Sequence, residues 1–307
     1  MVGCLHIGEL TRNMQKTPSI LFVVNPIAGG KGKTDWEVAI REFFKDSLYN
    51  IEFFIQTGKN DESSIRHHLA SVQPGIVVAI GGDGTVKMVA ELLIGTNMKL
   101  VIIPAGSANG LARELGIPLD VQGAIHVILE GRTTALDAIL INDKEHCFHL
   151  SDVGMNALLV KYFDESKTRG LWGYGRSLFK MFWNKKKMGV SIKTDTETLN
   201  CKAFMVVLAN AEKYGTGAVI NPNGDVSDGR FEVVVVRKLH PVDIIKAVLA
   251  RKTFESERIE VLRTKQVRIQ FQKSYPFQVD GEYQGKIASL EAKILPGVVQ
   301  ALLPVPG

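Results

Sequence analysis

Short apolar runs alternate with amphipathic segments over residues 19–129, and this alternation constrains the fold more strongly than any other feature. The apolar runs predict buried strands at 19–24, 51–55, 76–80 and 100–103. Apolar residues at helical spacing predict helices over 36–44, 61–72, 86–93, 108–115 and 121–129. This order predicts a mainly parallel, twisted sheet with helices on both faces, in a Rossmann-like α/β domain. Ligands are then expected at the carboxyl ends of its strands.

The pattern changes after about Leu136, where strands dominate and only 170–184 and 241–250 indicate helices. The predicted strands are 138–142, 146–151, 189–194, 201–209, 230–237, 266–271 and 277–279. A series of this kind predicts an antiparallel β-sandwich as a second domain. Two further apolar runs, 289–295 and 298–303, either close this second domain or return to the first.

Length and composition agree with two folded domains. The 307 residues are 45% hydrophobic and 22% charged, which excludes a disordered chain. No apolar run approaches the roughly 18 residues that a membrane span needs. The net charge of +5 permits an anionic substrate or an anionic membrane surface. The three cysteines lie far apart without a CxxC pair, so a reducing compartment fits better than a disulfide scaffold. His146 and His149 bracket Cys147 without a matching third ligand, so zinc is not predicted.

Three glycine-rich loops each follow a predicted strand, at 25–34, 81–85 and 104–110. Glycine lets successive backbone N–H groups converge on phosphate oxygens, and the positive end of the following helix favours the same anion. One such loop is equally consistent with an ordinary turn, but three on one sheet predict a site for nucleotide phosphates. The first loop is not a P-loop, because Ile27 stands where that motif needs its first glycine.

Two acidic stretches late in the chain are candidates for catalysis and metal binding. Asp280 and Glu282 flank Gly281 after a predicted strand, and carboxylates two residues apart on an extended chain lie on one side. They would either accept a proton from a hydroxyl or hold Mg²⁺ near a transferred phosphate. The stretch 225–232 offers oxygen ligands that suit Mg²⁺ or Ca²⁺. A hairpin turn is the structural alternative at both places.

The motifs NPxxGG, GGDGT, PAGSxN and DGE, in this order, resemble the diacylglycerol kinase catalytic-domain superfamily of lipid kinases. This group includes bacterial diacylglycerol kinases, YegS-like lipid kinases and sphingosine kinases, and the resemblance extends from about 19 to 303. It implies a nucleotide cleft between a Rossmann-like domain and a β-sandwich domain. It also implies a C-terminal return, so that 17–138 and 292–307 form the nucleotide-binding domain and 139–291 the lipid-substrate domain.

The resemblance further implies ATP and Mg²⁺ as cofactors, with site residues given by position in the motifs. Contacts to ATP are implied for Asn25, Pro26, Gly29, Gly30, Lys31, Thr57, Gly81, Gly82, Gly84, Thr85, Gly106, Ser107 and Asn109. Catalytic roles are implied for Asp83, Asp280 and Glu282, and the choice of base between the last two stays open. A structural Mg²⁺ is implied at the side chain of Asp228, with Asp225 and Arg230 flanking it.

One position departs from the bacterial diacylglycerol kinases that the motifs resemble. Those enzymes usually read PxGTxND, whereas Gly110 here replaces an aspartate that joins a metal–water network. The PAGSxN form is more like that of sphingosine and ceramide kinases. The acceptor is therefore expected to be diacylglycerol, a sphingoid base or a related lipid.

Basic residues interleave with aromatic and leucine side chains over 161–187. Such a segment suits the surface of an anionic bilayer, and packing of its apolar face on the sandwich is the alternative. We therefore expect a cytoplasmic lipid kinase with peripheral contact to the inner membrane face, no nucleic-acid partner, and homodimer formation left open. The alternatives are a soluble-substrate kinase of the NAD kinase type, which shares GGDGT, and a catalytically silent nucleotide-binding regulator, which Gly110 keeps open.

Overall fold

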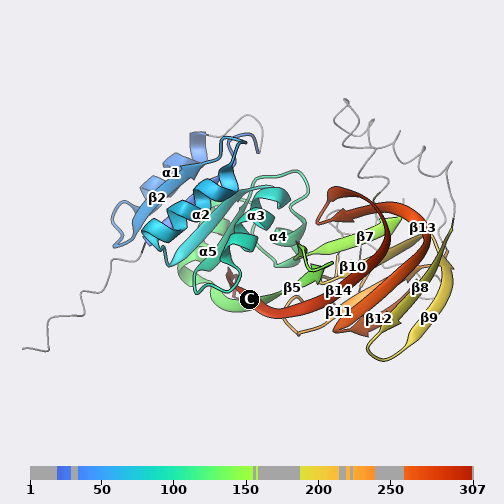
Figure 1. The fold of residues 1–307 in the computed structure, drawn as a ribbon. Helices are drawn as coiled ribbons and strands as arrows, with labels where there is room; N and C mark the ends of the chain where they lie inside the picture. The colour runs from blue at the N-terminus through green and yellow to red at the C-terminus, as the bar shows by residue number, and fades with distance from the viewer. Residues whose placement is uncertain are drawn as a thin grey trace, which may run out of the picture.

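The computed structural model describes residues 19–28, 34–154, 157, 187–213, 219–221, 224–238 and 259–305. All fourteen described strands belong to one hydrogen-bonded sheet that runs through two parts of the molecule. Figure 1 shows a part with helices, which contains the beginning of the described chain, beside a part built mainly of strands. The predicted helices 170–184 and 241–250 lie outside the described residues.

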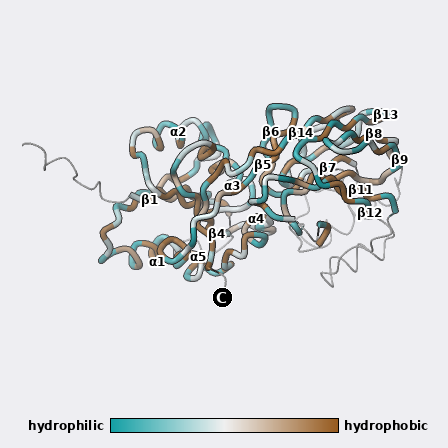
Figure 2. The backbone as a smooth tube through the Cα atoms, turned by 90° about the horizontal axis from the view of Figure 1, so that it is seen from below, coloured by the Kyte–Doolittle hydropathy of each residue, from teal (hydrophilic) through white to brown (hydrophobic). Residues whose placement is uncertain are grey.

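The first part is a parallel sheet in the order β4-β3-β1-β2. Its strands are β1 (Ser19–Val24), β2 (Asn50–Ile55), β3 (Ile76–Gly81) and β4 (Lys99–Pro104). Its helices are α1 (Thr34–Phe44), α2 (Asp61–Val72), α3 (Asp83–Leu93), α4 (Gly110–Glu114) and α5 (Val121–Glu130). Figures 1 and 2 show α1 and α5 on one face of the sheet and α2 and α3 on the other. The prediction of a parallel sheet with helices on both faces is confirmed.

The burial of these strands explains why the sequence predicts them. In β1, β3 and β4 every residue after the first is buried, because helices cover both faces of the sheet. Helix α3 differs from the prediction, since it begins at Asp83 rather than at Val86. Its cap residue is Gly82, in an extended conformation. Most of the GGDGT motif therefore forms the first turn of a helix instead of a loop.

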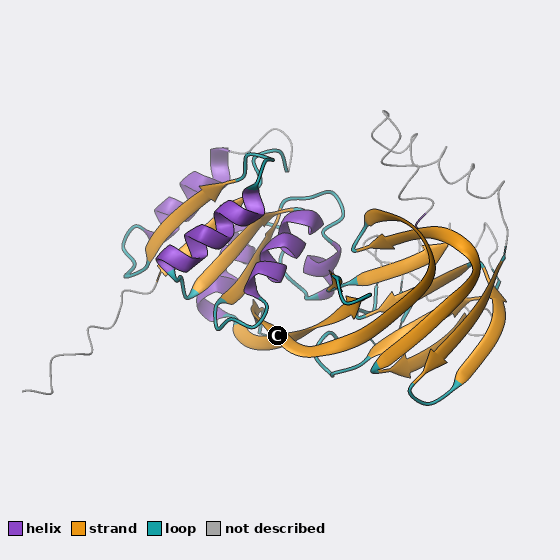
Figure 3. Ribbon diagram, in the orientation of Figure 1, coloured by secondary structure: helices purple, strands orange, loops and turns teal. Residues whose placement is uncertain are grey.

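The second part is antiparallel apart from one contact with the first. Its strands are β5 (Arg132–Ile141), β6 (Glu145–Cys147), β7 (Leu150–Gly154), β8 (Met188–Thr194), β9 (Thr198–Ala203), β10 (Met205–Ala209), β11 (Phe231–Val236), β12 (Ile259–Thr264), β13 (Gln266–Val279) and β14 (Glu282–Leu303). The sheet runs β12-β11-β10-β7-β13-β14, with β8 and β9 joined to β13 and with β5 and β6 joined to β14. Figure 3 shows strands and loops throughout its described residues.

Strand β14 connects the two parts. It pairs with β13 in the second part, then with β5, and residues Gln300 and Ala301 pair in parallel with Lys99 and Leu100 of β4. Its register against β5 shifts between Leu295 and Val299. The runs 289–295 and 298–303, predicted as separate strands, are thus one strand with an irregularity. Figure 1 shows it crossing from one part to the other.

Several predicted strand boundaries in the second part are wrong for a common reason. The run 146–151 is two strands, β6 and β7, and the run 201–209 is β9 and β10, which pair with different neighbours. The runs 266–271 and 277–279 are one strand, β13, and β12 was not predicted. Strands β7 and β10 are buried throughout and follow the partly exposed β6 and β9 without an intervening glycine or proline. Periodicity therefore does not reveal the change of strand partner.

Three clusters of buried apolar residues lie in the described part of the chain, and the smallest packs between β7, β10 and β11. The largest one combines β1–β4, the helices and the end of β14, and the other lies between the strands of the second part. Ala292 and Ile294 belong to the core of the second part, and β14 joins the largest core from Val299. The predicted domain boundaries at 138 and 292 stay a prediction. Within the described residues, no helix combines the length and the apolar character needed to cross a bilayer.

Candidate active site

A pocket of about 350 Å³ lies where β1, β2 and β3 end and α3 begins. Ten residues line it: Asn25, Pro26, Ile27, Gln56, Thr57, Gly58, Asp61, Gly82, Gly84 and Thr85. Six of these were predicted from the motifs, and Ile27, Gln56, Gly58 and Asp61 were missed. Gln56 follows a predicted strand and precedes Thr57, so its position at a carboxyl strand end was the signal for it. The predicted residues Gly29, Gly30 and Lys31 lie outside the described residues.

A chain of hydrogen bonds fixes the floor of this pocket. The Asn25 Nδ2 donates to Thr85 Oγ1 at 3.2 Å, and this hydroxyl donates to Gln56 Oε1 at 3.3 Å. Thr85 is 5% exposed, so its hydroxyl has little access to water. The backbone N–H groups of Asn25 and Gln56 are bonded to Ile80 and Val24. These hydrogen bonds fix the positions of the ends of β1 and β2 relative to the first turn of α3.

The carboxylate of Asp61 organises the rim of the pocket. It accepts hydrogen bonds from the N–H groups of Thr57 and Gly58, each at 2.8 Å. The bond from the Thr57 N–H is the first cause that holds the pKa of Asp61 below its ordinary value. The turn at 57–58 is therefore tied to the start of α2.

The third glycine loop supports the second from behind. A Cβ built on Gly106 would lie 2.5 Å from the Cα of Gly82, so these backbones pack without room for a side chain. Asn109 closes the loop, because its Oδ1 accepts from Gly106 N–H at 2.8 Å and its Nδ2 donates to Gly106 O at 2.9 Å. Gly106, Ser107 and Asn109 do not line the pocket themselves. Gly106 packs on Gly82 next to the pocket and is held by Asn109, whereas Ser107 is exposed.

Replacing Gly106 with alanine is expected to weaken nucleotide binding by at least about tenfold, since the new methyl group pushes backbone against backbone. Titration with a fluorescent ATP analogue measures this. Gly75→Ala is the steric control, because the nearest atom to its Cβ position, Ser19 O, lies 4.0 Å away and its φ is not positive. Equal affinities of the Gly106→Ala protein and the wild-type protein would show that the contact is dispensable.

Asp280 and Gly281 form a tight hairpin turn between β13 and β14. Their φ angles are 49° and 86°, and Val279 pairs with Glu282 across the turn. Positive φ at both positions is typical of a type I′ turn, for which Asp-Gly is a favoured sequence. The expectation of an extended chain with both carboxylates on one side is therefore wrong, since the segment is a hairpin turn. A catalytic role of either carboxylate stays a prediction.

The carboxylate of Asp280 is engaged by the turn between β6 and β7. Its Oδ1 accepts from the N–H groups of His149 and Leu150 at 3.0 and 3.2 Å, and its Oδ2 accepts from Phe148 N–H at 3.1 Å. The Cys147 thiol donates to Oδ1 at 3.3 Å. Four donors around one carboxylate make it an anchor for the hairpin.

The carboxylate of Glu282 points in a different direction, toward α3. Its Oε1 lies 3.2 Å from the position that a Cβ on Gly84 would occupy. Gly82 and Gly84 both line the pocket, and Asp83 between them is the first residue of α3. Glu282 is exposed, and none of the described residues holds its carboxylate by a hydrogen bond or ion pair. Among the described residues it is therefore an unpaired carboxylate, and it lies beside the pocket and the positive end of a helix.

The predicted metal residues do not form a coordination shell. Asp225 accepts from the N–H and hydroxyl of Ser227 at 2.9 and 2.7 Å. Asp228 accepts from Arg230 N–H at 2.9 Å and forms an ion pair with Arg263. Across the described part of the chain, no cluster of three or more His, Cys, Asp or Glu side chains is arranged to hold a metal. A metal site at these residues stays a prediction.

Asp137 lies against the same turn and was missed by the sequence analysis. Its two oxygens accept from the N–H groups of Gly229 and Gly297 at 2.6 and 2.7 Å. Burial raises its pKa, and the negative charges of Asp228 and Asp225 act in the same direction. It lies inside β5, where the only signal is an acidic residue within an apolar run. Its contacts tie the 225–230 turn to the irregularity in β14.

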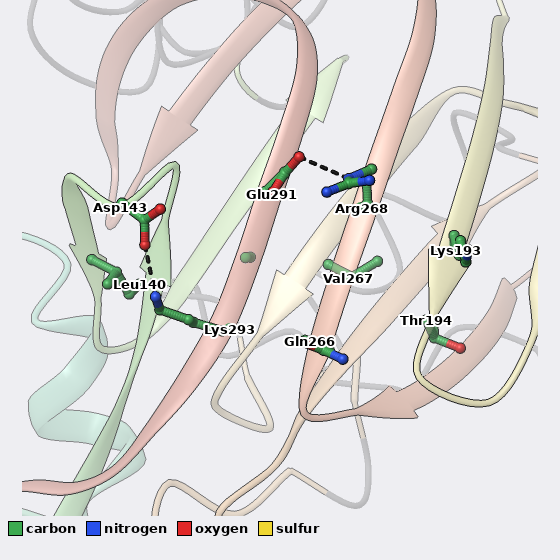
Figure 4. Close-up of a pocket in the computed structure, with 10 residues that line it drawn as sticks. Leu140, Asp143, Lys193, Thr194, Gln266, Val267, Arg268, Glu291 and Lys293 are labelled. Atoms are coloured by element: carbon green, nitrogen blue, oxygen red, sulfur yellow. Dashed lines mark hydrogen bonds and ion pairs between the residues drawn. The ribbon is translucent and has the colours of Figure 1, made fainter.

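A second pocket lies on the outer face of β5, β8, β13 and β14 (Figure 4). Its cations are largely paired, since Arg268 contacts Glu291 and Lys293 contacts Asp143, each at 2.7 Å. None of the predicted site residues lines it. The candidate active site is therefore the pocket at β1–β3, together with the hairpin turn that carries Glu282.

Two family models match this chain over most of its length. Residues 19–141 match the diacylglycerol kinase catalytic domain, and residues 151–303 match the YegS C-terminal NAD kinase beta sandwich-like domain. The chain belongs to the diacylglycerol kinase catalytic-domain family. The second match also confirms the predicted β-sandwich class of the second domain. This family membership agrees with the resemblance drawn from the four motifs.

Individual relatives of this family member are distant in sequence. The diacylglycerol kinase of Staphylococcus epidermidis is 28% identical over 220 residues, which cover 69% of each chain. The uncharacterized protein sll0036 of Synechocystis is 26% identical over 312 residues, covering 94% of this chain and 71% of that protein. The crystal structure of a diacylglycerol kinase from Bacillus anthracis superposes with a TM-score of 0.71 at 20% identity, covering 94% of this chain and 97% of that one. The structural match supports the fold.

Proposed function

We propose that this chain is an ATP- and Mg²⁺-dependent lipid kinase that transfers the γ-phosphate of ATP to a lipid hydroxyl. The observation that carries the proposal is the position of Glu282, which lies across Gly84 from a pocket built of glycine-rich loops. A phosphate pocket beside an unpaired carboxylate is the arrangement that phosphoryl transfer to an alcohol needs. The names of the staphylococcal relatives make diacylglycerol the first acceptor to test.

The pocket residues would position the phosphates. The hydrogen-bond chain from Asn25 through Thr85 to Gln56 holds the strand ends, and the first turn of α3 directs its N–H groups toward bound phosphate. Phosphoryl transfer depends mainly on positioning and on stabilisation of charge, which such fixed donors supply. Mg²⁺ carried by ATP would neutralise part of the phosphate charge. Asp83, which lies between the pocket residues Gly82 and Gly84, is the carboxylate that would hold this ion.

Glu282 is proposed as the group that accepts the proton of the lipid hydroxyl. The choice between Asp280 and Glu282, open from the sequence, is guided by their contacts. The Asp280 oxygens already accept from four donors, whereas the Glu282 carboxylate is free. Asp280 then acts as the anchor that keeps Glu282 next to α3.

Radiolabelled ATP and vesicles that contain a mixed lipid extract test the proposed function. We expect label in the organic phase, and the mass of the product identifies the acceptor as diacylglycerol, a sphingoid base or another lipid. Label that appears only in an aqueous product would indicate a soluble-substrate kinase. Nucleotide binding without any labelled product would indicate a silent regulator.

Asp83→Asn is expected to lower lipid-dependent ATP turnover by at least about a hundredfold, because it removes the carboxylate at the first position of α3 beside the phosphates. The thermal unfolding temperature should stay within a few degrees of the wild-type value, since Asp83 is only partly buried. Turnover in the lipid assay and the melting curve are measured on the same preparation. Full turnover by this variant would contradict its proposed role.

Membrane contact through 161–187 stays a prediction, because all of this segment except Lys187 lies outside the described residues. The cytoplasmic location, the absence of a nucleic-acid partner and homodimer formation also stay predictions. Lys187 places its ammonium 5.3 Å from the centre of the Phe204 ring. This contact places the end of the segment next to the second part.

A further inference from the structure

One face of α3 is directed at the second part of the molecule along its whole length. Gly84, Lys87 and Glu91 lie at positions i, i+3 and i+7, which share one side of a helix. Gly84 lies against Glu282, and Glu91 lies against His146 of β6 with 3.8 Å between Oε1 and Nδ1. Lys87 between them is 7% exposed. The helix that begins at the nucleotide pocket thus carries a buried cation into the contact with the second part.

Lys87 lies next to the anchor of the hairpin turn. Burial lowers the pKa of His146, and the positive charge of Lys87 acts in the same direction. Burial raises the pKa of Cys147, the charge of Asp280 adds to this rise, and Lys87 opposes it. Cys147 donates its thiol hydrogen to Asp280 Oδ1 at 3.3 Å. The ammonium of Lys87 is not among the groups that line the nucleotide pocket. Its charge acts on Glu91 and Cys147, as does the charge of Asp280, so it lies on the side of the anchoring carboxylate.

We propose that Lys87, Glu91, His146 and Asp280 form a charged cluster that positions the hairpin turn, and with it Glu282, against the first turn of α3. Lys87 and Glu91 are positioning residues in this arrangement, since they act through the turn and do not touch the nucleotide. The proposal rests on the proposed phosphoryl transfer. The members of this charged cluster come from three elements, α3, β6 and the β13–β14 turn, so the cluster connects the nucleotide-binding part to the second part.

The charges facing Glu91 come from every element packed around it. Burial raises its pKa to about 7, Lys87 opposes this shift, and Asp280, Glu145 and Glu62 add to it. Glu62 belongs to α2, and Glu145 to β6. At pH 6 Glu91 is mostly neutral, and Lys87 faces Asp280 without competition. At pH 8 Glu91 is ionised and shares the ammonium, so the turn is held less firmly.

Lys87→Met tests the position of the cation while keeping most of the side-chain volume. We expect kcat for lipid phosphorylation to fall at least about tenfold, with the affinity for a fluorescent ATP analogue changed less than about twofold. Lys87→Arg should recover most of the activity, and Lys193→Met, an exposed lysine of β8, should leave kcat unchanged. An unchanged kcat, or a loss of nucleotide affinity as large as the loss of kcat, would overturn the proposal.

Glu91→Gln provides a second test that also has a readout independent of activity. The ratio of its kcat to the wild-type value should be close to 1 at pH 6 and about threefold higher at pH 8. Its melting temperature relative to wild type should also rise from pH 5 to pH 8, because ionised Glu91 costs folding free energy only in the wild-type protein. A ratio and a melting difference that do not vary with pH would overturn the charged cluster. A wild-type protein without lipid kinase activity would instead overturn the proposed function, and the melting difference would still test the cluster.

Discussion

Replacement of Glu282 by glutamine is expected to lower kcat for lipid phosphorylation by about 10²–10⁴-fold, the usual contribution of a positioned base. The carboxylate is free and exposed beside Gly84, so glutamine can occupy the same space but cannot accept the proton. The affinity for ATP should stay within about threefold of the wild-type value, because the pocket residues are unchanged. Steady-state kinetics with diacylglycerol vesicles and a nucleotide-binding titration measure the two quantities.

Glu291→Gln is the matched control for this experiment. Glu291 lies on the same strand, β14, and is exposed, and its ion pair with Arg268 lies on the outer face of the sheet. Its removal is expected to change kcat less than about twofold, as is usual for a surface pair far from the chemistry. Equal activity of the Glu282→Gln and Glu291→Gln proteins would exclude Glu282 as the base and return Asp280 to consideration.

Asp280→Asn is expected to lower the free energy of unfolding by about 2–4 kcal/mol, because backbone N–H groups at 148–150 lose a charged acceptor. Asparagine tolerates the φ of 49° at this position, so the effect isolates the charge and one oxygen rather than backbone strain. Activity should fall as well, since the turn that carries Glu282 loses its anchor. Urea unfolding followed by circular dichroism measures the stability.

Asp143→Asn is the matched control for this variant. Asp143 also has a positive φ, 51°, but its side chain is 80% exposed and its partner is the surface residue Lys293. A change of less than about 0.5 kcal/mol is expected for such an exposed pair. A stability loss at Asp280 no larger than at Asp143 would show that the four contacts to its carboxylate do not anchor the hairpin.

Much of the fold could be predicted from the sequence, because burial on both faces leaves a plain signal. Strands β1, β3 and β4 are almost wholly buried, and their apolar runs coincide with their observed bounds to within one residue. Helix α2 begins and ends at the predicted residues. The predicted strand boundaries are wrong where the chain changes its pairing partner, as at Phe204 between β9 and β10. Such a change does not alter the hydrophobic periodicity of the sequence.

The candidate site could be predicted only in part. The glycine-rich loops place Gly82, Gly84 and Thr85 at the pocket because short motifs specify local backbone geometry. Gln56 and Asp61 were missed, since their importance depends on which strand ends are neighbours in the sheet. The packing of Gly106 on Gly82 could not be predicted either, because it joins two loops that lie far apart in the sequence.

The sequence by itself determined the strand–helix order of the first part, the family motifs and the presence of two carboxylates in the DGE segment. Only the tertiary structure decided what those carboxylates do. Asp280 becomes an anchor because the turn between β6 and β7 and the start of β7 bring N–H groups to it from 130 to 132 residues away in the chain. Glu282 becomes the free group because the hairpin turn directs it to α3. The burial of Lys87 and the partial burial of Glu91 likewise follow from packing between distant segments. Removal from water strengthens the effect of their charges on neighbouring groups.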